Sequence, residues 1–389
     1  MKATIGIVGW GSLSALGSHK EQIWKKYQEA NHVLQQGKPQ REWWGKIPSA
    51  EEQQLEELRL SQKNYRQLDR SVLLAILAAQ RAARDAGWPP HHPAGVNIGS
   101  SRGATEITER RHEDFLQKTS SVLPSTSPLS TLGNLSYWVA NHLDLEGIPI
   151  SHSITCSTAM HSLFNAVAWL KAGMSKYFLA GGSEAPLTAF TLAQMKALKI
   201  YASAEAADFP CRALAENKEE NTMVLGEGAA CFCLERSPAE AMAWIRGMGY
   251  GREPIRHAAA LSKDGQCLQQ AMRQALGELA PSAVDLIITH APGTVGGDAA
   301  ERAAVRQVFG ENIPLLSNNK WKIGHTLGAS AALSIEMALL MLQHQEAISV
   351  PYLTGSALPK RPLRNILINA LGFGAQASSI LISGVEAEI

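Results

Sequence analysis

The chain has 389 residues, 45% of them hydrophobic and 18% charged, with a net charge of +1. This composition excludes a disordered chain, and the balanced charge provides no basic surface for a nucleic acid. The length allows two or three domains. Five cysteines without a disulfide framework are typical of a reducing compartment, so we expect a cytoplasmic protein.

The first third of the chain contains predicted structural elements but few candidate catalytic residues. An apolar run at the N-terminus is broken at Gly6, Gly9 and Gly11, so no signal peptide is expected. Residues 36–64 show no clean periodicity and are expected to form a surface excursion. Residues 96–103 are predicted to be a strand that enters a glycine loop, and this loop contains Arg102.

Cys156 lies where a short β-branched segment ends and a helical pattern begins. A thiol at the N-terminal end of a helix is expected to have a lowered pKa, because the helix dipole favours the thiolate. Free N–H groups at such a helix end could also stabilise an oxyanion. A single cysteine is more often a buried apolar residue than a nucleophile. The interpretation of Cys156 as a nucleophile therefore depends on residues elsewhere in the chain.

Two histidines further along the chain favour the interpretation of Cys156 as a nucleophile. An apolar run predicted to be a buried strand ends at His290 and enters a Gly/Pro/Thr loop, after which Asp298 is expected to cap a helix starting near Ala299. His325 follows a second strand and a polar loop, and it precedes an apolar helix predicted over 331–342. That helix is too short to cross a bilayer. Both histidines thus lie in loops after strands, where catalytic side chains are commonly found.

The order strand, glycine or serine loop, helix, strand occurs twice. Residues 96–103, the Cys156 turn and the strand 177–182 form the first copy, and the His290 loop, the His325 turn and the strand 366–369 form the second. Two matching halves, with predicted bounds 1–238 and 239–389, favour two packed sheets with helices between and outside them. In that arrangement Cys156, His290 and His325 would converge where the halves meet.

Several motifs then resemble one family in both order and surroundings. They are Thr-Cys-Ser-Thr at 155–158, Thr-His-x-x-Gly-Thr-x-x-Gly-Asp-x-x-Glu at 289–301, Lys-x4-His at 320–325 followed by Leu-Gly-Ala, and Gly-Phe-Gly at 372–374. The chain is similar to the β-ketoacyl-[acyl-carrier-protein] synthases, and the likeness spans essentially its whole length. The Cys-His-His order is that of the elongating, decarboxylating branch.

The resemblance implies a fold and a reaction. The fold is α/β and thiolase-like, with five αβαβα layers and a pseudo-twofold relation between the halves. The reaction is decarboxylative Claisen condensation of a Cys156-bound acyl group with malonyl-acyl carrier protein. No resident cofactor is implied, because 4′-phosphopantetheine arrives on the acyl carrier protein. A homodimer or a heterodimer with a second ketosynthase-like subunit is expected, and no metal-ligand spacing occurs.

The resemblance also implies roles for individual residues. His290 and His325 would stabilise the enolate oxygen, and Lys320 would help to hold the two histidines in place. Phe373, with Gly374 beside it, resembles the family's gate, and its backbone N–H would form an oxyanion hole with that of Cys156. Three further residues are expected to bind substrate, namely Thr294, Met160 and Arg102.

The departures from the family pattern bear on the substrate. Pro292 replaces a hydroxyl-bearing residue of the His-Gly-Thr-Gly-Thr motif, and Arg102 stands where elongating synthases carry an aliphatic residue of the acyl pocket. We hypothesise that Arg102 shapes or caps this pocket. These departures favour a specialised synthase of the aryl polyene or flexirubin type over a housekeeping fatty-acid enzyme. Two alternatives stay open, a non-catalytic partner subunit like a chain-length factor and a biosynthetic thiolase or acyltransferase.

Overall fold

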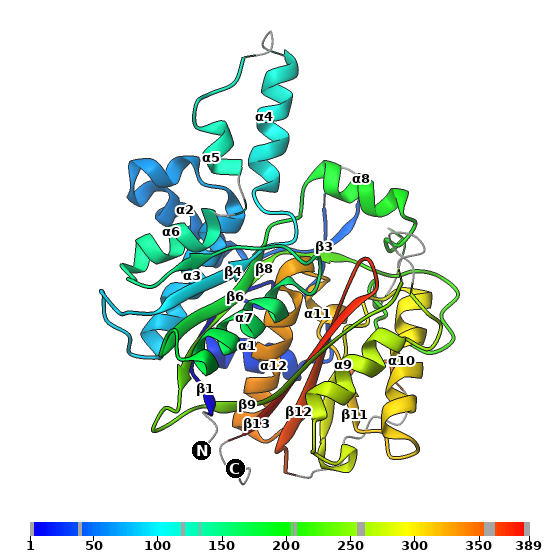
Figure 1. Ribbon diagram of the computed structural model, residues 1–389. Helices are drawn as coiled ribbons and strands as arrows, with labels where there is room; N and C mark the ends of the chain where they lie inside the picture. Colours follow the sequence, from blue (N-terminus) through cyan, green and yellow to red (C-terminus); the bar gives the residue numbers. More distant parts are fainter. Residues whose placement is uncertain are drawn as a thin grey trace.

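The computed structural model describes residues 4–37, 41–117, 121–130, 132, 134–203, 205, 208–254, 261–353 and 362–384 (Figure 1). In the N-terminal part the strands are β1 (Ile5–Leu13), β2 (Gln35–Gln36), β3 (Trp43–Gly45), β4 (Gly95–Gly99), β5 (Pro149–Ile150), β6 (Tyr177–Glu184), β7 (Leu225–Gly226) and β8 (Gly228–Arg236). The helices of this part are α1 (Lys20–Gln28), α2 (Ser49–Ser61), α3 (Arg70–Asp85), α4 (Thr105–Gln117), α5 (Thr126–Ser130), α6 (Asn134–Leu143), α7 (Thr158–Ala172) and α8 (Ala189–Ala197).

The C-terminal part has the same order of main strands and helices but fewer additional elements. Its strands are β9 (Ala243–Arg252), β10 (Leu286–Ile288), β11 (Leu315–Ser317), β12 (Asn365–Gly372) and β13 (Gln376–Gly384). Its helices are α9 (Gln266–Leu276), α10 (Val295–Phe309), α11 (Lys320–Ile323) and α12 (Ser330–His344).

The two halves have the same sheet topology. From the junction outward the first half runs β1-β8-β6-β4-β5, and the second runs β9-β13-β12-β10-β11. In both halves the first two neighbouring pairs are antiparallel and the next two are parallel. The halves join edge to edge through a short antiparallel pairing of β1 with β9. This matching order confirms the duplication predicted from the sequence.

Five layers result from where the helices pack. α3 and α6 cover the outer face of the first half, and α9 with α10 covers the outer face of the second. α7 and α12 lie in contact with each other between the sheets (Figure 1). Because α7 and α12 are buried by sheets on both sides, their apolar residues belong to one core that includes Leu163, Leu333 and Met337. The fold is the thiolase-like αβαβα arrangement.

α12 is longer than the sequence pattern predicted. Together with the turn before it, it forms an apolar helical segment over Leu327–His344, which by length and composition alone could cross a membrane. The prediction that this helix is too short to span was therefore wrong. However, 89% of the segment is buried inside the protein, so its apolar composition is explained by its central position between two sheets.

The segment 36–64 is also more regular than predicted. Its described residues form α2 and strand β3, and β3 pairs in parallel with β7. Only Glu51 and Leu55 of α2 are buried, which explains why no apolar periodicity was visible in the sequence. Residues 43–45 are therefore part of a small sheet beside the centre of the molecule, while α2 lies at the surface.

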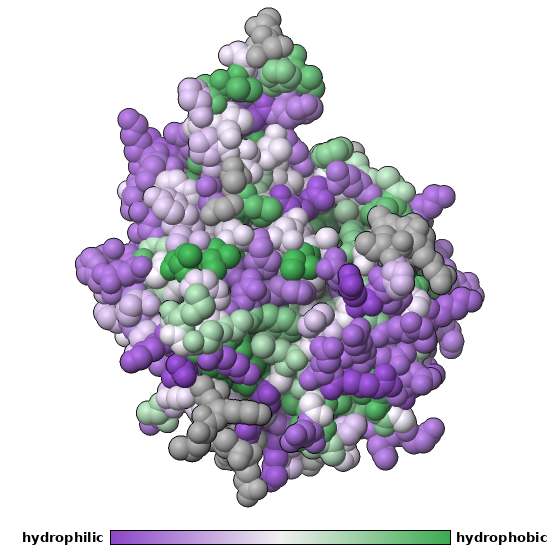
Figure 2. All heavy atoms as spheres, viewed as in Figure 1, coloured by the Kyte–Doolittle hydropathy of each residue, from purple (hydrophilic) through white to green (hydrophobic). Residues whose placement is uncertain are grey.

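α4 and α5 form a projection at one end of the molecule (Figure 1). Figure 2 shows apolar residues gathered on this projection, where Leu116, Val122 and Leu123 are 68%, 56% and 51% exposed. Side chains of this kind are usually buried, so their exposure together distinguishes this projection from the rest of the surface.

Candidate active site

Cys156 sits at a turn with a strained backbone. Thr155, directly before it, has φ of 46°, which is unusual for a β-branched residue and costs on the order of 1–3 kcal/mol. The turn ends three residues later in α7, and Leu327 has φ of 41° at the equivalent position three residues before α12. The same turn geometry therefore precedes both central helices, and it aims Cys156 at the space where the two halves meet.

His325 is fixed through its backbone. Its N–H donates to the carbonyl of Val224 at 2.6 Å, and its carbonyl accepts from the N–H of Gly226 at 3.0 Å. Gly324, with φ of 78°, allows the chain to turn sharply before it. These contacts join the backbone of His325 to the small sheet of β3 and β7. Residues 43–45 pair with β7 and therefore help to hold the loop of His325 in place.

His290 is fixed by a buried carboxylate. The N–H groups of His290 and Ala291 donate to the two oxygens of Glu301 at 2.8 and 2.6 Å, and Asn369 donates to the same carboxylate at 3.1 Å. Asn318 donates to the carbonyl of Ala291 at 3.1 Å. A loop with this many hydrogen bonds holds its imidazole in one place.

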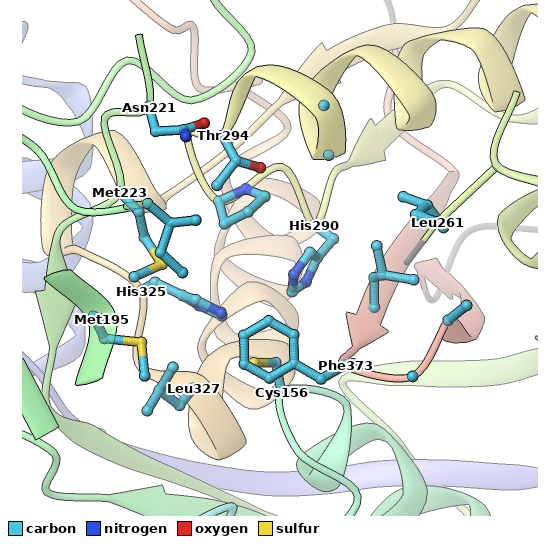
Figure 3. A pocket seen from close by; sticks show the side chains of 18 of the residues that line it. Cys156, Met195, Asn221, Met223, Leu261, His290, Thr294, His325, Leu327 and Phe373 are labelled. Atoms are coloured by element: carbon cyan, nitrogen blue, oxygen red, sulfur yellow. The ribbon is translucent and has the colours of Figure 1, made fainter. Parts of the chain in front are cut away.

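Cys156, His290 and His325 line one cavity of about 460 Å³ (Figure 3). The three residues are only 6%, 5% and 2% exposed. The imidazole rings of the histidines lie 5.2 Å apart between centroids and are nearly perpendicular at 85°. The sequence prediction that these three residues meet at the junction of the halves is therefore confirmed by their geometry.

Burial and charge set the protonation of the histidines. Burial lowers the pKa of His290 and of His325 well below 6.5, and the nearby Lys320 ammonium lowers both further. Burial also lowers the pKa of Lys320 to about 8, against the opposing effect of the Glu301 carboxylate. Both imidazoles are therefore neutral at pH 7, beside a lysine that is still largely protonated.

The thiol differs from the sequence prediction. Burial raises the pKa of Cys156 to about 12, the Glu184 carboxylate raises it further, and the Lys320 ammonium opposes both effects. The predicted lowered pKa was wrong for the resting cavity, because desolvation of the thiolate outweighs the favourable helix end. With a pKa raised to about 12, the Cys156 thiol keeps its proton at neutral pH.

Glu184 is a buried residue between the two halves that the sequence analysis did not single out. Its carboxylate accepts from Ser100 Oγ at 2.8 Å and the N–H of Ser101 at 2.7 Å in the first half, and from the N–H of Gly328 at 2.9 Å in the second. A Cβ on Gly328 would lie 2.5 Å from Glu184, so only glycine fits. A carboxylate at the end of strand β6, after two glycines, was the signal that could have identified it.

The remaining predicted residues fall into two groups. Phe373, Gly374 and Thr294 line the cavity, and Phe373 is 40% exposed at the tip of the β12–β13 hairpin. Figure 3 draws its ring across Cys156. Arg102 and Met160 do not line the cavity: Met160 is buried in the core on α7.

Arg102 contacts α8 instead of the cavity. Its Nη2 donates to Oε1 of Gln194 at 2.6 Å, and the neighbouring Met195 does line the cavity. Several apolar residues gather near Cys156 on this side, namely Met195, Met223, Leu225 and Leu327, with Leu187 and Ile200 packed against them. Arg102 thus reaches the apolar wall only through α8.

Asp298 does not cap the helix as predicted. α10 begins at Val295 with Thr294 as its N-cap residue, so Asp298 lies inside the first turn. There it accepts from the N–H of Gly293 at 3.1 Å and forms a buried ion pair with Lys218. The sequence pattern placed the helix start four residues too late because Gly296 and Gly297 have low helix propensity.

The five-layer fold and the buried Cys-His-His cavity define a condensing enzyme of the thiolase-like class. The chain matches the model of the β-ketoacyl synthase N-terminal domain over residues 2–239 and that of the C-terminal domain over residues 242–351. The chain therefore belongs to the β-ketoacyl synthase family, whose members are acyltransferases.

Individual relatives agree with this assignment. The chain is 27% identical over 365 residues to nodulation protein E of Rhizobium meliloti, with 90% of this chain and 88% of the relative covered. It is 26% identical over 355 residues to 3-oxoacyl-[acyl-carrier-protein] synthase 2 of Vibrio cholerae, with 83% and 84% covered.

Solved structures show the same fold. A β-ketoacyl synthase from Burkholderia phymatum STM815 is 23% identical with a TM-score of 0.83, covering 99% of this chain and 100% of that one. A type II polyketide ketosynthase, solved in complex with its acyl carrier protein, is 19% identical with a TM-score of 0.85, again covering 99% and 100%.

Proposed function

We propose that the protein condenses a Cys156-bound acyl group with a malonyl thioester and releases CO2. The observation that carries this proposal is the convergence of one thiol and two neutral imidazoles on a single cavity. In the first step the Cys156 sulfur attacks the acyl thioester, and the carrier thiol leaves with the proton of Cys156. This covalent step separates acyl transfer from carbon–carbon bond formation.

In the second step the malonyl thioester loses CO2, and the electron pair of the broken C–C bond forms an enolate. The enolate carbon then bonds to the acyl carbonyl carbon, and the Cys156 sulfur leaves and regains a proton. His290 and His325 donate Nε2–H hydrogen bonds to the enolate oxygen. Their lowered pKa values support this role, because a neutral imidazole carries the donor without the cost of a buried charge.

A second oxyanion site would bind the acyl carbonyl oxygen. We assign it to the backbone N–H groups of Cys156 and Phe373, neither of which donates to a backbone carbonyl of the described residues. Phe373 acts as a gate in this proposal. Its position on the short hairpin turn, followed by Gly374 with φ of 84°, supports a ring that can move aside.

We propose that substrates arrive as 4′-phosphopantetheine thioesters on an acyl carrier protein, with no resident cofactor. Thr294 on the cavity wall would hydrogen-bond the pantetheine arm. Relatives solved as a ketosynthase with an acyl carrier protein, or with a chain-length factor, support a carrier-protein partner and a dimer. The exposed apolar projection of α4 and α5 supports a subunit contact as well. The setting of the reaction would be the cytoplasm.

The proposal is tested by incubating the protein with a panel of acyl-carrier-protein thioesters and measuring its intact mass. An added acyl group on Cys156, followed by CO2 release from malonyl-carrier protein, is the expected result. Failure of any acyl group to load would favour the alternative of a non-catalytic partner subunit. Condensation without CO2 release would favour the thiolase alternative.

Replacing Arg102 by isoleucine is expected to change which acyl chains load, since Arg102 holds Gln194 next to the apolar wall at Met195. We expect the longest accepted chain to increase, with loading of the best wild-type substrate changed by less than about threefold. Intact-mass profiling over a series of chain lengths measures this. An unchanged chain-length profile would mean that Arg102 has no part in substrate selection.

The pH dependence of CO2 release should reflect the two histidines. Because the pKa of each imidazole is lowered from 6.5, neither gains a proton until the pH falls well below that value. On the acidic side, the rate is therefore expected to stay level from pH 7 down to about 6.5 and to decline at lower pH. Lys320, with a pKa of about 8, should cause an alkaline decline that is absent from Lys320→Gln. An acidic midpoint at or above 6.5 would argue against neutral buried imidazoles.

A further inference from the structure

Glu184, the last residue of β6, is fully buried, and its two carboxylate oxygens have different partners. Oε1 accepts only from the first half, from Ser100 Oγ at 2.8 Å and from the N–H of Arg102 at 3.2 Å. Oε2 accepts from the N–H of Ser101 at 2.7 Å in the first half and from the N–H of Gly328 at 2.9 Å in the second. A single oxygen therefore joins one loop of each half.

The partner in the second half lies three residues after His325. Gly328 belongs to the short turn directly before α12, and a Cβ on it would lie 2.4 Å from the N atom of Ser101. The two loops are thus in direct contact. Leu327, in the same turn, packs with Cys156 in one apolar cluster (Figure 3). A displacement of this turn would therefore move both His325 and the cavity wall relative to the thiol.

The partner loop in the first half supports the turn of Cys156. The carbonyl of Ser101 accepts a hydrogen bond at 3.0 Å from Oγ of Ser153, three residues before the thiol. A Cβ on Gly99 would lie 2.2 Å from Cγ2 of Thr158, so the end of β4 packs directly on the first residue of α7. The loop after β4 is therefore connected to the backbone on both sides of the thiol.

We propose that Glu184 is a positioning residue, whose Oε2 sets the distance between His325 and Cys156 by accepting hydrogen bonds from Ser101 and Gly328. This inference rests on the proposed condensation, in which the enolate held by the imidazole must reach the acyl group on the sulfur. Glu184 does not line the cavity, so it acts only through the two loops. A displacement of about 1 Å between reacting groups can lower a rate about 10²-fold.

Two substitutions separate the reach of Glu184 from its charge. Glu184→Asp keeps the charge but shortens the side chain by one methylene, so that one oxygen no longer reaches both N–H groups. Glu184→Gln keeps the length, and its amide oxygen can accept from Ser101 and Gly328 while its NH2 group faces Ser100 Oγ. We expect the aspartate variant to lower the kcat of CO2 release about tenfold or more with KM within about twofold, and the glutamine variant to keep kcat within about threefold.

A double-substitution cycle tests whether Glu184 acts through His325. Combining Glu184→Asp with His325→Ala should lower the rate no further than His325→Ala alone, because the imidazole that Glu184 positions is then already absent. A role confined to general stability predicts instead that the two losses multiply. Multiplied losses, or a wild-type kcat in Glu184→Asp, overturn the proposal.

A second variant and a control guard against a simple loss of folding. Gly328→Ala separates the same two loops through its Cβ and should lower kcat as Glu184→Asp does; a normal kcat in this variant also overturns the proposal. Asp285, before the start of β10, accepts from the backbone N–H groups of Arg364 and Asn365. Asp285→Asn should lower the melting temperature while keeping kcat within about twofold, since it is remote from the cavity.

The position of the His325 ring can also be followed without turnover. In protein labelled with 15N-histidine, its ring signals are identified by their absence from His325→Ala. We expect these signals to shift in Glu184→Asp and to match the wild type in Glu184→Gln. Unshifted signals in Glu184→Asp overturn the proposal. A wild type that releases no CO2, together with signals that shift as expected, contradicts the proposed condensation and supports the positioning role of Glu184.

Discussion

Replacing His325 by alanine is expected to lower the rate of CO2 release from a malonyl thioester by about 10²–10³-fold, the usual loss when one oxyanion donor is removed. His325 is buried, and its backbone is fixed by hydrogen bonds with Val224 and Gly226. The enolate would then form with half of its stabilising donors. Release of labelled CO2 under saturating substrate measures the effect.

His325→Asn is the matched variant, because an asparagine amide also offers an N–H donor. We expect it to retain part of the activity that alanine loses. Loading of an acyl group on Cys156 should continue in both variants, since the first step does not use the enolate site. Normal CO2 release from the alanine variant would remove His325 from the mechanism.

Replacing Cys156 by alanine is expected to abolish condensation to below detection, because no other thiol can carry the acyl group. The four other cysteines are buried, and none of them lines the cavity. CO2 release should persist, since His290 and His325 remain in place. Intact mass should show no acyl group on the variant, and product analysis should show the decarboxylated acetyl thioester in place of the 3-oxoacyl product.

Cys156→Ser provides the comparison for this variant. A serine hydroxyl is similar in size but a weaker nucleophile without an activating base, so loading should fall by several orders of magnitude without a change in fold. An acyl group found on Cys211 or Cys267 in the alanine variant would contradict the assignment of the nucleophile.

The fold and the three central side chains could be predicted because their signals are local and ordered. Cys156, His290 and His325 each follow a strand, and the repeated order of elements placed them at equivalent edges of two matching sheets. Motif order then restricted the reaction to one family. Strand ends and glycine loops are visible in a sequence because the chain must change direction there.

Properties that depend on packing could not be predicted. The raised pKa of Cys156 depends on burial and on Glu184, which is 28 residues away in sequence. The positions of Arg102 and Met160 outside the cavity depend on how α7 and α8 pack, and the resemblance alone could not show this. The start of α10 was misplaced because two glycines concealed its first turn. Each of these features is decided by tertiary contacts.

The Cys156 thiol belongs to one half of the duplicated chain and both imidazoles belong to the other, and Glu184 accepts hydrogen bonds from both halves. Neither repeat therefore contains a complete set of reactive groups. An ancestor that possessed a single repeat could have built such a cavity only by pairing with another copy of itself. In the present chain the two halves contribute different groups to one shared cavity, the thiol from the first half and the imidazoles from the second.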